Sequence, residues 1–457
     1  MKNMTLQAIA DACHGKIYYP EKGNVTDITA SRVVLDSRLV VEDSVFIATR
    51  GERVDGHSFI PQVFEKGALG VICEEVPDDP AGPCILVEDS FVALKDVARY
   101  YRNQLDLKIV GITGSVGKTS TKEFIATVLS KHYSTWKTQA NFNNEVGMPL
   151  TILQATEEHE ILVLEMGINH FGEMDRLSEI ARPDVMVITN IGQCHLEYLG
   201  DRDGVLKAKT ECFNHLNTDA VVILNGDDDK LATVREVMGR KPLFFGRNKT
   251  NDYYAQSEKD EGLLGTDVAL ASALSDMSVV THIPLPGAHM VYNALAAMAV
   301  GETLGLNSEE IAQGIADVSA TSGRSNIVRG RNCIIIDDCY NANPVSMKAA
   351  IDLLGTAKGR KVAILGDMFE LGEDENSLHK GVGEYAADKE TDVIVCVGKL
   401  SRYMFDGARE ADVKEAFHYE DIESLIAAIP DIVRDEDTVL VKASHSMQFS
   451  RIVDKLK

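Results

Sequence analysis

Between residues 108 and 228, short apolar runs alternate with stretches of helical period. KIVGIT, EILVLEMG, PDVMVITNIG and AVVILNGDD have the composition of buried strands, and KTSTKEFIATVLSKH, EMDRLSEIAR and RDGVLKAKTECFNHL that of amphipathic helices. This alternation is typical of βαβ units around a parallel sheet. A second series, NCIIIDD, RKVAILGD, TDVIVCVGK and DTVLVKAS with helices between, predicts another nucleotide-fold-like α/β unit near the C-terminus.

The chain of 457 residues is long enough for two to four domains. The first stretch has short strand-like pieces, SVFIAT and GVICEE, and the segment from about 240 to 285 is less periodic, which predicts a β-rich excursion. We expect an α/β protein of three domains: a small α/β domain over 1–86, a central parallel-sheet domain over 87–318 and a Rossmann-like domain over 319–457.

Charge and apolar content exclude several classes of protein. The formal net charge of −24 argues against non-specific binding to nucleic acid or to an anionic membrane. The start MKNMTLQAIADACHG lacks the apolar stretch of a signal peptide. The sequence contains no run of about 18 apolar residues, so no membrane span is predicted. The eight cysteines are scattered without a C-x-x-C pair, which favours reduced, buried thiols in a cytosolic protein.

The segment GITGSVGKTS, residues 111–120, lies between a predicted strand and a predicted helix. Its glycines permit backbone angles that other residues avoid, and the start of a helix is an anion site. Lys118 would reach the β/γ-phosphates, and the Thr119 hydroxyl would bind Mg²⁺. The general pattern G-x-x-x-x-G-K-[ST] requires glycine where this chain has Ile112. The alternative is a glycine-rich turn that binds nothing.

Two polar residues follow strands next to this loop. Glu165 ends ILVLE, and His195 follows VMVITNI after a short GQC. The carboxyl ends of parallel strands meet at one edge of a sheet, so both should face the same edge as Thr119. An acidic oxygen beside bound phosphates is a natural Mg²⁺ ligand. A single histidine after a strand is more often structural, and only its position beside Glu165 favours a role at a metal.

Lys209 falls in the apolar side of the helix that begins near Val205, and Lys207 falls on the opposite side. A lysine aimed at the interior is costly unless it is paired or neutral. It could pair with a buried acid or extend to solvent. It could instead lose its proton and contact phosphate, or add CO₂ to become an anionic carbamate. The residues alone leave these alternatives open.

Several further polar residues are weak signals when taken singly. The loop with Asn141, Asn143 and Asn144 could be turn chemistry or a substrate loop. Asn293 lies on an alanine-rich helix, where close packing is the simpler reading. Others lie in a loop or just after a strand: Arg324, Asp338 and Asn341.

Taken together, these segments resemble the Mur ligases, which build the peptide stem of bacterial peptidoglycan using ATP. The loop TGSVGKT matches the short phosphate-loop form of that family, and NFNNEVGMPLTIL, DDCYNANPVSM and LGDMFELGE match in the family's order. The resemblance covers nearly the whole chain. YNANP and GDMFELG favour the branch that joins D-alanyl-D-alanine to UDP-N-acetylmuramoyl-tripeptide through an acyl phosphate, because sister ligases carry a histidine-containing motif at the YNANP position.

The resemblance also implies roles for residues. Lys118, Lys209, Glu165 and His195 would be catalytic, and Thr119, Glu165, His195 and carbamylated Lys209 would hold Mg²⁺. ATP would contact Gly114, Ser115, Val116, Gly117, Lys118, Thr119, Ser120, Asn293, Arg324 and Asp338. The peptide substrates would contact Ser37, Arg38, Asp55, His57, Asn141, Asn143, Asn144 and Asn341.

Some positions depart from the family pattern. Met290 stands where asparagine is frequent, Ala443 and His445 where glycine and arginine are expected, and Thr210 and Cys212 where glycine and isoleucine are frequent. None of these removes a residue expected to take part in the chemistry. We expect a cytoplasmic monomer without membrane insertion. The competing hypotheses are a sister ligase, a nucleotide-binding scaffold without activity, and a GTPase, which the lack of an N-K-x-D motif disfavours.

Overall fold

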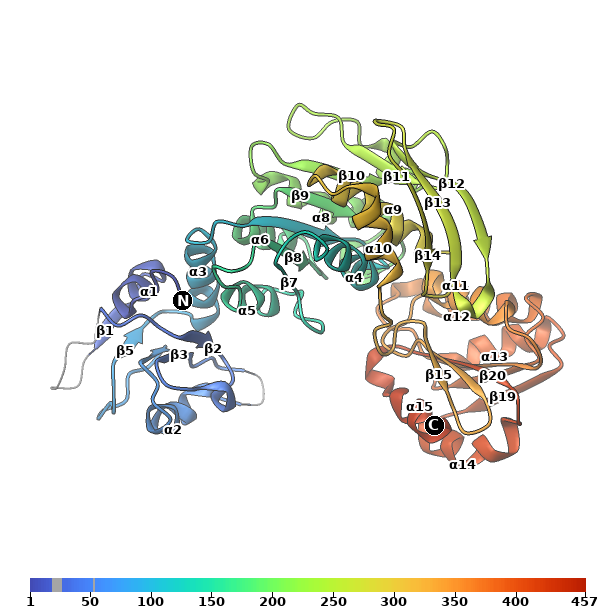
Figure 1. Ribbon diagram of the computed structural model, residues 1–457. Helices are drawn as coiled ribbons and strands as arrows, with labels where there is room; N and C mark the ends of the chain where they lie inside the picture. The colour runs from blue at the N-terminus through green and yellow to red at the C-terminus, as the bar shows by residue number, and fades with distance from the viewer. Residues whose placement is uncertain (19–26, 52–53) are drawn as a thin grey trace.

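The computed structural model describes residues 1–18, 27–51 and 54–457, and these form three sheets with helices packed on them. Figure 1 shows the sheets along an arch, with the N-terminal one at one foot, the nine-stranded one at the top and the C-terminal one at the other foot. The predicted α/β class is confirmed. No helix in the described ranges is both long and apolar enough to cross a membrane.

The N-terminal sheet has the order β1-β5-β4-β3-β2 in the described part of the chain. Only the β1–β5 pair is antiparallel. Apolar residues alternate between its two faces, and one face continues into the core of the central sheet through the helix at residues 90–102. The elements are α1 (Leu6–Ala12), β1 (Lys16–Tyr18), β2 (Arg32–Val34), η1 (Ser37–Leu39), β3 (Ser44–Ile47), η2 (Gly56–Phe59), α2 (Ile60–Glu65), β4 (Gly70–Cys73), β5 (Cys84–Leu86) and α3 (Ser90–Arg102).

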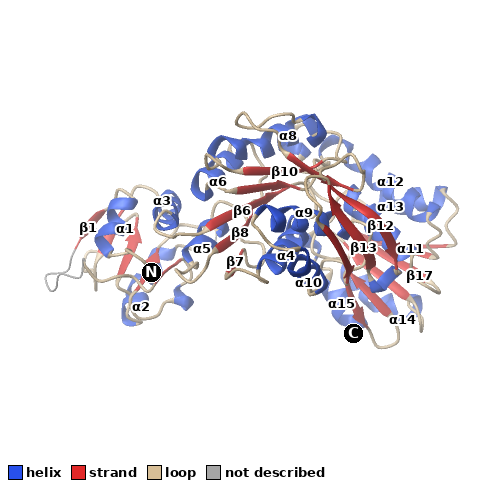
Figure 2. Ribbon diagram, turned by 45° about the horizontal axis from the view of Figure 1, so that its top comes forward, coloured by secondary structure: helices blue, strands red, loops and turns tan. Residues whose placement is uncertain are grey.

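The central sheet has the order β14-β13-β12-β11-β10-β9-β6-β8-β7. The strands from β7 to β12 are parallel, and the last two pairs, β12–β13 and β13–β14, are antiparallel. The predicted β-rich excursion is therefore confirmed, and it extends the same sheet (Figure 2). The strands are β6 (Lys108–Thr113), β7 (Thr135–Lys137), β8 (Ile161–Glu165), β9 (Val185–Ile188), β10 (Val221–Asn225), β11 (Leu243–Gly246), β12 (Tyr253–Asp260), β13 (Thr266–Ser272) and β14 (Ser278–Ile283).

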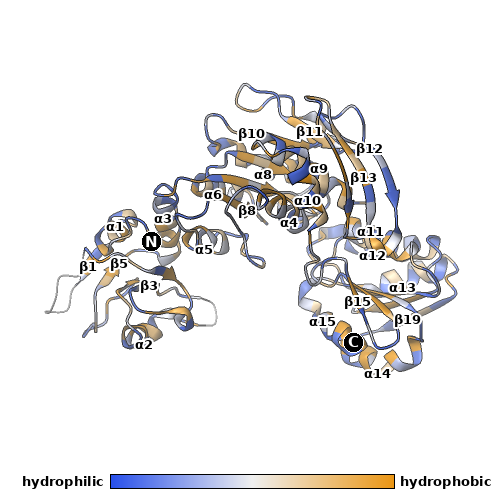
Figure 3. Cartoon of the chain, viewed as in Figure 1, coloured by the Kyte–Doolittle hydropathy of each residue, from blue (hydrophilic) through white to orange (hydrophobic). Residues whose placement is uncertain are grey.

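Helices cover both faces of this sheet at β6, β8, β9 and β10, so these parallel strands are apolar on both sides. One core contains side chains of α3, α5, α6 and α8, and the other contains side chains of α4, α9 and α10. Figure 3 shows the resulting apolar colour on the strands. The helices are α4 (Lys118–Leu129), α5 (Gly147–Leu153), α6 (Glu173–Ala181), α7 (Leu196–Leu199), α8 (Arg202–Thr210), η3 (Glu211–His215), η4 (Leu231–Thr233), η5 (Gly262–Leu264), α9 (Met290–Thr303) and α10 (Ser308–Ala316).

The C-terminal sheet has the order β15-β16-β20-β17-β18-β19, with only β15–β16 antiparallel. Helices α11, α12 and α13 cover one face, and α14 and α15 the other. The elements are β15 (Asn326–Arg329), β16 (Ile334–Asp337), α11 (Pro344–Gly355), β17 (Lys361–Gly366), η6 (Gly372–Asp374), α12 (Glu375–Asp388), β18 (Val393–Val397), α13 (Ser401–Glu410), β19 (Glu415–Tyr419), α14 (Ile422–Ile432), β20 (Thr438–Lys442), η7 (His445–Met447) and α15 (Ser450–Leu456).

One predicted helix is shorter than expected. The α-helix that begins at Arg202 ends at Thr210 and continues as the 3₁₀ helix η3. The Thr210 hydroxyl donates to the carbonyls of Leu206, 2.8 Å away, and Lys207, 3.1 Å away. Hydroxyl groups that bond back to the preceding turn weaken and bend helices, which accounts for the change at this position.

Candidate active site

The phosphate-loop candidate connects β6 to α4 and has the backbone of a tight turn. Gly114 has a φ of +149° and Gly117 a φ of +85°. A Cβ atom on Gly114 would come within 1.9 Å of the Thr189 hydroxyl oxygen. Asn190, just beyond β9, supports the loop because its side-chain oxygen accepts from the Val116 N–H at 2.9 Å and its carbonyl accepts from the Ser115 N–H at 3.0 Å.

Lys118 and Thr119 begin α4, where the first N–H groups of a helix have no partner within the helix. The Lys118 ammonium donates to the carbonyl oxygens of Gly114 at 2.8 Å and Ser115 at 3.4 Å. Burial lowers the pKa of Lys118, and Glu165 partly offsets this. A half-buried ammonium group beside free N–H groups is the arrangement from which proteins build anion sites.

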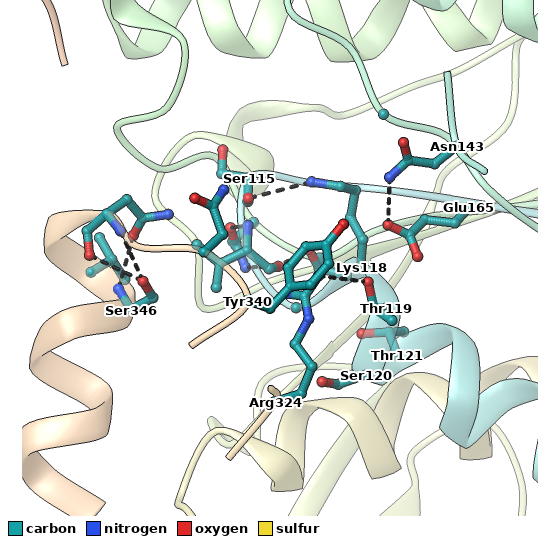
Figure 4. A pocket seen from close by; sticks show the side chains of 18 of the residues that line it. Ser115, Lys118, Thr119, Ser120, Thr121, Asn143, Glu165, Arg324, Tyr340 and Ser346 are labelled. Atoms are coloured by element: carbon teal, nitrogen blue, oxygen red, sulfur yellow. Dashed lines mark hydrogen bonds between the residues drawn. The ribbon is translucent and has the colours of Figure 1, made fainter. Parts of the chain in front are cut away.

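Glu165 ends β8 with its side chain only 2% exposed. Its Oε1 accepts from Asn143 Nδ2 at 2.8 Å, while its buried Oε2 has no hydrogen-bond partner among the described residues (Figure 4). Lys122 Nζ, also buried, lies 3.9 Å from Oε2 and donates to the Thr138 carbonyl at 2.7 Å. A buried carboxylate oxygen without a donor is a ligand position for a cation.

His195 precedes α7 and forms a hydrogen bond with a residue of the C-terminal domain. Its Nδ1 lies 2.7 Å from Glu370 Oε2. This hydrogen bond holds the pKa of Glu370 below its usual value. The pair therefore connects the edge of the central sheet to the loop that follows β17.

Lys209 is 1% exposed, which confirms that it points inward. Among the described residues it makes no ion pair with a carboxylate within 4.0 Å, so the alternative of a buried acid partner is not what the structure contains. Burial lowers its pKa to about 8, with Cys194 acting against the shift and Lys118 adding to it. Its amine is therefore more easily neutralised than that of an exposed lysine.

Arg324 reaches from the C-terminal domain to the phosphate-loop candidate. Its Nη2 donates to Thr119 Oγ1 at 3.2 Å, and its guanidinium lies 3.8 Å from the centroid of the Tyr340 ring (Figure 4). The segment around it is held by backbone N–H groups. Gly323 N–H donates to Asp337 Oδ2 at 3.0 Å, and Ser325 N–H donates to Asp338 Oδ1 at 2.9 Å.

Asp338 and Lys442 form a buried ion pair, with Nζ 2.6 Å from Oδ2. Because the other oxygen of Asp338 accepts from Ser325, this carboxylate shapes the loop that carries Arg324. Asn293 is similarly engaged, since its side-chain oxygen accepts from Thr121 Oγ1 at 2.9 Å and its amide nitrogen lies 3.3 Å from Met290 Sδ. Met290, which departs from the family pattern, thus supports Asn293.

A cavity of about 660 Å³ lies between the central and C-terminal domains. Most of the predicted ATP and metal residues line it, as do some predicted substrate residues: Ser115, Val116, Gly117, Lys118, Thr119, Ser120, Asn143, Asn144, Glu165, His195, Asn293, Arg324, Asp338 and Asn341. Gly114, Asn141 and Lys209 do not line it.

The predicted substrate residues of the N-terminal domain also lie outside this cavity. Arg38 donates to Asp36, and this ion pair lowers the pKa of Asp36 to about 2. Asp55 lies 2.7 Å from His57 Nδ1, and His57 Nε2 accepts from the Glu74 N–H at 2.9 Å. The Ser37 carbonyl accepts from Lys66 at 2.8 Å. All of these contacts lie within the first domain.

Sequence reasoning missed other residues that line the cavity. Asn190 and Asn225 lie at or just beyond the carboxyl ends of β9 and β10, so the sheet-edge rule could have found both. Lys442 ends β20 and had the same signal. No local pattern marks several others, among them His289, Tyr292 and Val345.

The donor set at the cavity fits Mg²⁺. Glu165 Oε2 lacks a donor and the Thr119 hydroxyl lines the same cavity, and both are oxygen ligands of the kind that Mg²⁺ prefers. In the described ranges no group of three or more His, Cys, Asp or Glu side chains forms a metal cluster.

A glycine-rich loop at a helix start, on the edge of a parallel sheet and faced by a second α/β domain, defines a multidomain nucleotide-binding protein of the P-loop kind. Three family models match along the chain: "Mur ligase family, catalytic domain" over 29–88, "Mur ligase middle domain" over 112–301 and "Mur ligase, glutamate ligase domain" over 323–445. The chain belongs to the Mur ligase family.

Full-length relatives agree with this assignment. The chain is 37% identical to the UDP-N-acetylmuramoyl-tripeptide–D-alanyl-D-alanine ligase of Bacillus subtilis (strain 168), with 100% of this chain and 99% of the relative covered. It is 33% identical to the ligase of the same name from Escherichia coli (strain K12), with the same coverage.

Solved structures of similar proteins share the fold. A crystal structure of MurF from Acinetobacter baumannii has a TM-score of 0.89 and 32% identity, with 99% of this chain and 98% of that chain covered. The MurF ligase of Thermotoga maritima in complex with ADP has a TM-score of 0.81 and 31% identity, with 93% and 96% covered.

Proposed function

We propose that this protein is an ATP-dependent amide ligase that joins D-alanyl-D-alanine to UDP-N-acetylmuramoyl-tripeptide, giving the pentapeptide precursor of peptidoglycan with ADP and phosphate. The observation that carries the proposal is full-length similarity to ligases of that name, combined with a cavity that contains the phosphate loop, Glu165 and Arg324. The relative solved with ADP supports a nucleotide at this cavity.

Amide formation from a carboxylate requires an activated acyl group. The γ-phosphoryl group of ATP passes to the carboxylate of the tripeptide, giving an acyl phosphate and ADP. The amine of D-alanyl-D-alanine attacks the acyl carbon and loses a proton, and the tetrahedral intermediate expels phosphate as the amide forms. The protein contributes mainly by positioning the reactants and by offsetting charge on the transferring group.

Lys118 and the first N–H groups of α4 would hold the phosphates, and Arg324 would approach them from the C-terminal domain. Thr119 and Glu165 would hold Mg²⁺, with His195 nearby, and Mg²⁺ when bound would neutralise phosphate charge. Asn293 and Asp338 would help to shape the nucleotide site. Asn143, Asn144 and Asn341 line the same cavity, where we propose that they contact the peptide substrates.

Lys209 is the proposed site of a carbamate. It is buried, it has no carboxylate partner among the described residues, and its pKa is lowered to about 8, so its neutral amine is available to add CO₂. The resulting anion would supply the carboxylate-like ligand that this position lacks. It would also reduce the repulsion between Lys209 and Lys118.

We propose domain limits at 1–86, 87–318 and 319–457, which the breaks between the three sheets support. The first domain would bind the UDP-sugar peptide near Ser37, Arg38, Asp55 and His57, with Asn141 in the adjoining loop.

We also propose that the protein is a monomer in the cytoplasm. The eight free thiols fit a reducing compartment, and sedimentation analysis tests the monomer.

The test is phosphate release from ATP with UDP-N-acetylmuramoyl-tripeptide, with and without D-alanyl-D-alanine, followed by mass spectrometry of the product. We expect phosphate to be released only when both substrates are present, and we expect a product with the mass of the pentapeptide. Release with a different amine would identify a sister ligase. The absence of release with any amine would favour a nucleotide-binding scaffold.

A further inference from the structure

The segment 366–372, GDMFELG, begins at the end of β17 and is fixed to the C-terminal domain by several hydrogen bonds. Asp367 Oδ1 accepts from the N–H of Ser401 at 2.7 Å and from its hydroxyl at 2.5 Å. Met368 N–H donates to His379 Nε2 at 2.9 Å, and Phe369 N–H donates to the Ser444 hydroxyl at 3.1 Å. These bonds fix the backbone immediately before Glu370.

Glu370 and His195 meet across the domain boundary, and both have unusual backbones. Their φ values are +62° and +52°, a left-handed region that non-glycine residues rarely adopt. Such conformations persist where the surrounding structure enforces them, often at functional sites. Here they place Glu370 Oε2 2.7 Å from His195 Nδ1.

The backbone beside this pair also spans the boundary. A Cβ atom at Gly372 would lie 3.8 Å from the Glu197 nitrogen and 3.9 Å from the Leu196 carbonyl carbon, at the start of α7. The end of the segment therefore packs against the helix that follows His195. The position of the C-terminal domain thus decides whether the Glu370 carboxylate is available to the histidine.

The hydrogen bond determines which nitrogen of His195 remains free. When Nδ1 donates to the carboxylate, the neutral ring carries its lone pair on Nε2. In the described part of the chain Nε2 makes no hydrogen bond, and His195 lines the same cavity as Thr119 and Glu165. Histidines that bind metals usually donate their other nitrogen to a carboxylate or carbonyl, which fixes tautomer and ring orientation.

We propose that Glu370 is a positioning residue, supplied by the C-terminal domain, that holds His195 with Nε2 available to the divalent cation of the active site. The inference rests on the proposed function, which places Mg²⁺ beside Thr119 and Glu165. When the C-terminal domain docks, the segment GDMFELG then brings Glu370 to His195 and so orients the ring for cation binding.

A hydrogen bond with a purely structural role would behave differently. The two side chains are 47% and 22% exposed, and exposed pairs of this kind add little to stability. Loss of Glu370 should therefore leave the thermal midpoint of unfolding nearly unchanged. A change in cation affinity without a change in stability separates the two roles.

The experiment measures Mn²⁺ binding by electron paramagnetic resonance on the full chain with ADP present and without turnover. The variants are Glu370→Ala, Glu370→Gln and His195→Ala, with Glu373→Ala as the control, because Glu373 is exposed on η6 beside the segment. We expect Glu370→Ala and His195→Ala to weaken Mn²⁺ binding by about 10-fold or more. Glu370→Gln should weaken it less, since the amide oxygen still accepts from Nδ1. The control should bind as wild type.

Nitrogen-15 NMR of the His195 ring gives a second readout, with the signal assigned by its loss in His195→Ala. The wild-type ring should carry its proton on Nδ1, and Glu370→Ala should show a mixture of tautomers. Wild-type Mn²⁺ affinity in Glu370→Ala, or a ring protonated on Nε2, would overturn the proposal. Ligase turnover by the wild-type protein is measured separately, so failure of the proposed function is distinguishable from failure of this inference.

Discussion

Arg324 of the C-terminal domain donates a hydrogen bond from Nη2 to the hydroxyl of Thr119 in the phosphate-loop candidate, 3.2 Å away. The two residues are 205 positions apart in the sequence. Their contact brings a cation of the C-terminal domain to the first turn of α4, so both domains contribute groups to the proposed anion site.

The ring of Tyr340 stacks on the guanidinium of Arg324. The guanidinium carbon lies 3.8 Å from the ring centroid. Tyr340→Ala should lower kcat/KM for ATP by about 2- to 30-fold, the range of a cation–π contact. Steady-state kinetics measure the effect. Tyr340→Phe is the matched control, since it keeps the ring and should retain most of the activity. Equal losses in both variants would assign the effect to the hydroxyl group instead.

Gly114→Ala should abolish nucleotide binding while leaving the fold intact. The added Cβ would lie 1.9 Å from the Thr189 hydroxyl, and a φ of +149° is unfavourable for alanine, so the loop must move. Calorimetric titration with ADP measures the loss. Gly239→Ala is the control, because Gly239 has a φ of +76° but open space around it. Unchanged ADP affinity in Gly114→Ala would show that the loop geometry is not needed.

Lys209 should carry an added CO₂ in the active protein. We expect Lys209→Ala to lose ligase activity, and a small carboxylic acid to restore part of it by replacing the missing anion. Lys207→Ala, which alters the exposed face of the same helix, should retain activity. Native mass spectrometry in bicarbonate buffer should show a mass increase equal to one CO₂ in the wild type and none in Lys209→Ala. Full activity in carefully CO₂-depleted buffer would contradict the carbamate.

The contact between Glu145 and Arg176 should stabilise the folded protein at neutral pH and should lose this effect in acid. Its carboxylate accepts from Arg176 Nε at 2.5 Å and Nη2 at 2.9 Å, and this contact lowers its pKa below the ordinary 4.5. The folded protein therefore binds this proton less tightly than the unfolded chain. The stabilisation is fully present above about pH 4.5 and is lost as the pH falls through the lower folded pKa.

Glu145→Gln should accordingly lower the free energy of unfolding by about 1 kcal/mol at pH 7, as for a well-aligned surface pair. The difference from wild type should shrink as the pH falls below 4.5. Urea unfolding at several pH values measures this. Glu236→Gln, at an exposed position without an ion pair among the described residues, is the control. A difference that stayed constant with pH would rule out the ion pair as its cause.

The sequence was most informative where chemistry and local structure coincide. The phosphate loop, Glu165 at the end of β8 and the inward Lys209 follow from strand ends and helical periodicity, and the structure places them there. Contacts between domains were not predictable in this way. Nothing local to Glu370 indicates that it meets His195, because that contact depends on how two separately folded sheets are oriented.

The same limit applies to the residues around Arg324. Tyr340 belongs to the segment YNANP, but its stacking on the guanidinium depends on the turn that Asp337 and Asp338 impose on residues 323–325. Lys442 ends β20, so the sheet-edge argument that identified Glu165 applies to it as well. Its pairing with Asp338 could not be predicted without the order of strands in the C-terminal sheet.

The cavity is lined by residues of both the central and the C-terminal domain. A molecule bound there contacts both domains and adds its binding free energy to the folded state of each. Heat should then unfold the two domains at separate temperatures in the free protein and together when the cavity is filled. The nucleotide would act as a reversible crosslink between the two domains. The decrease in the temperature difference between the two calorimetric transitions on binding would measure the strength of this crosslink.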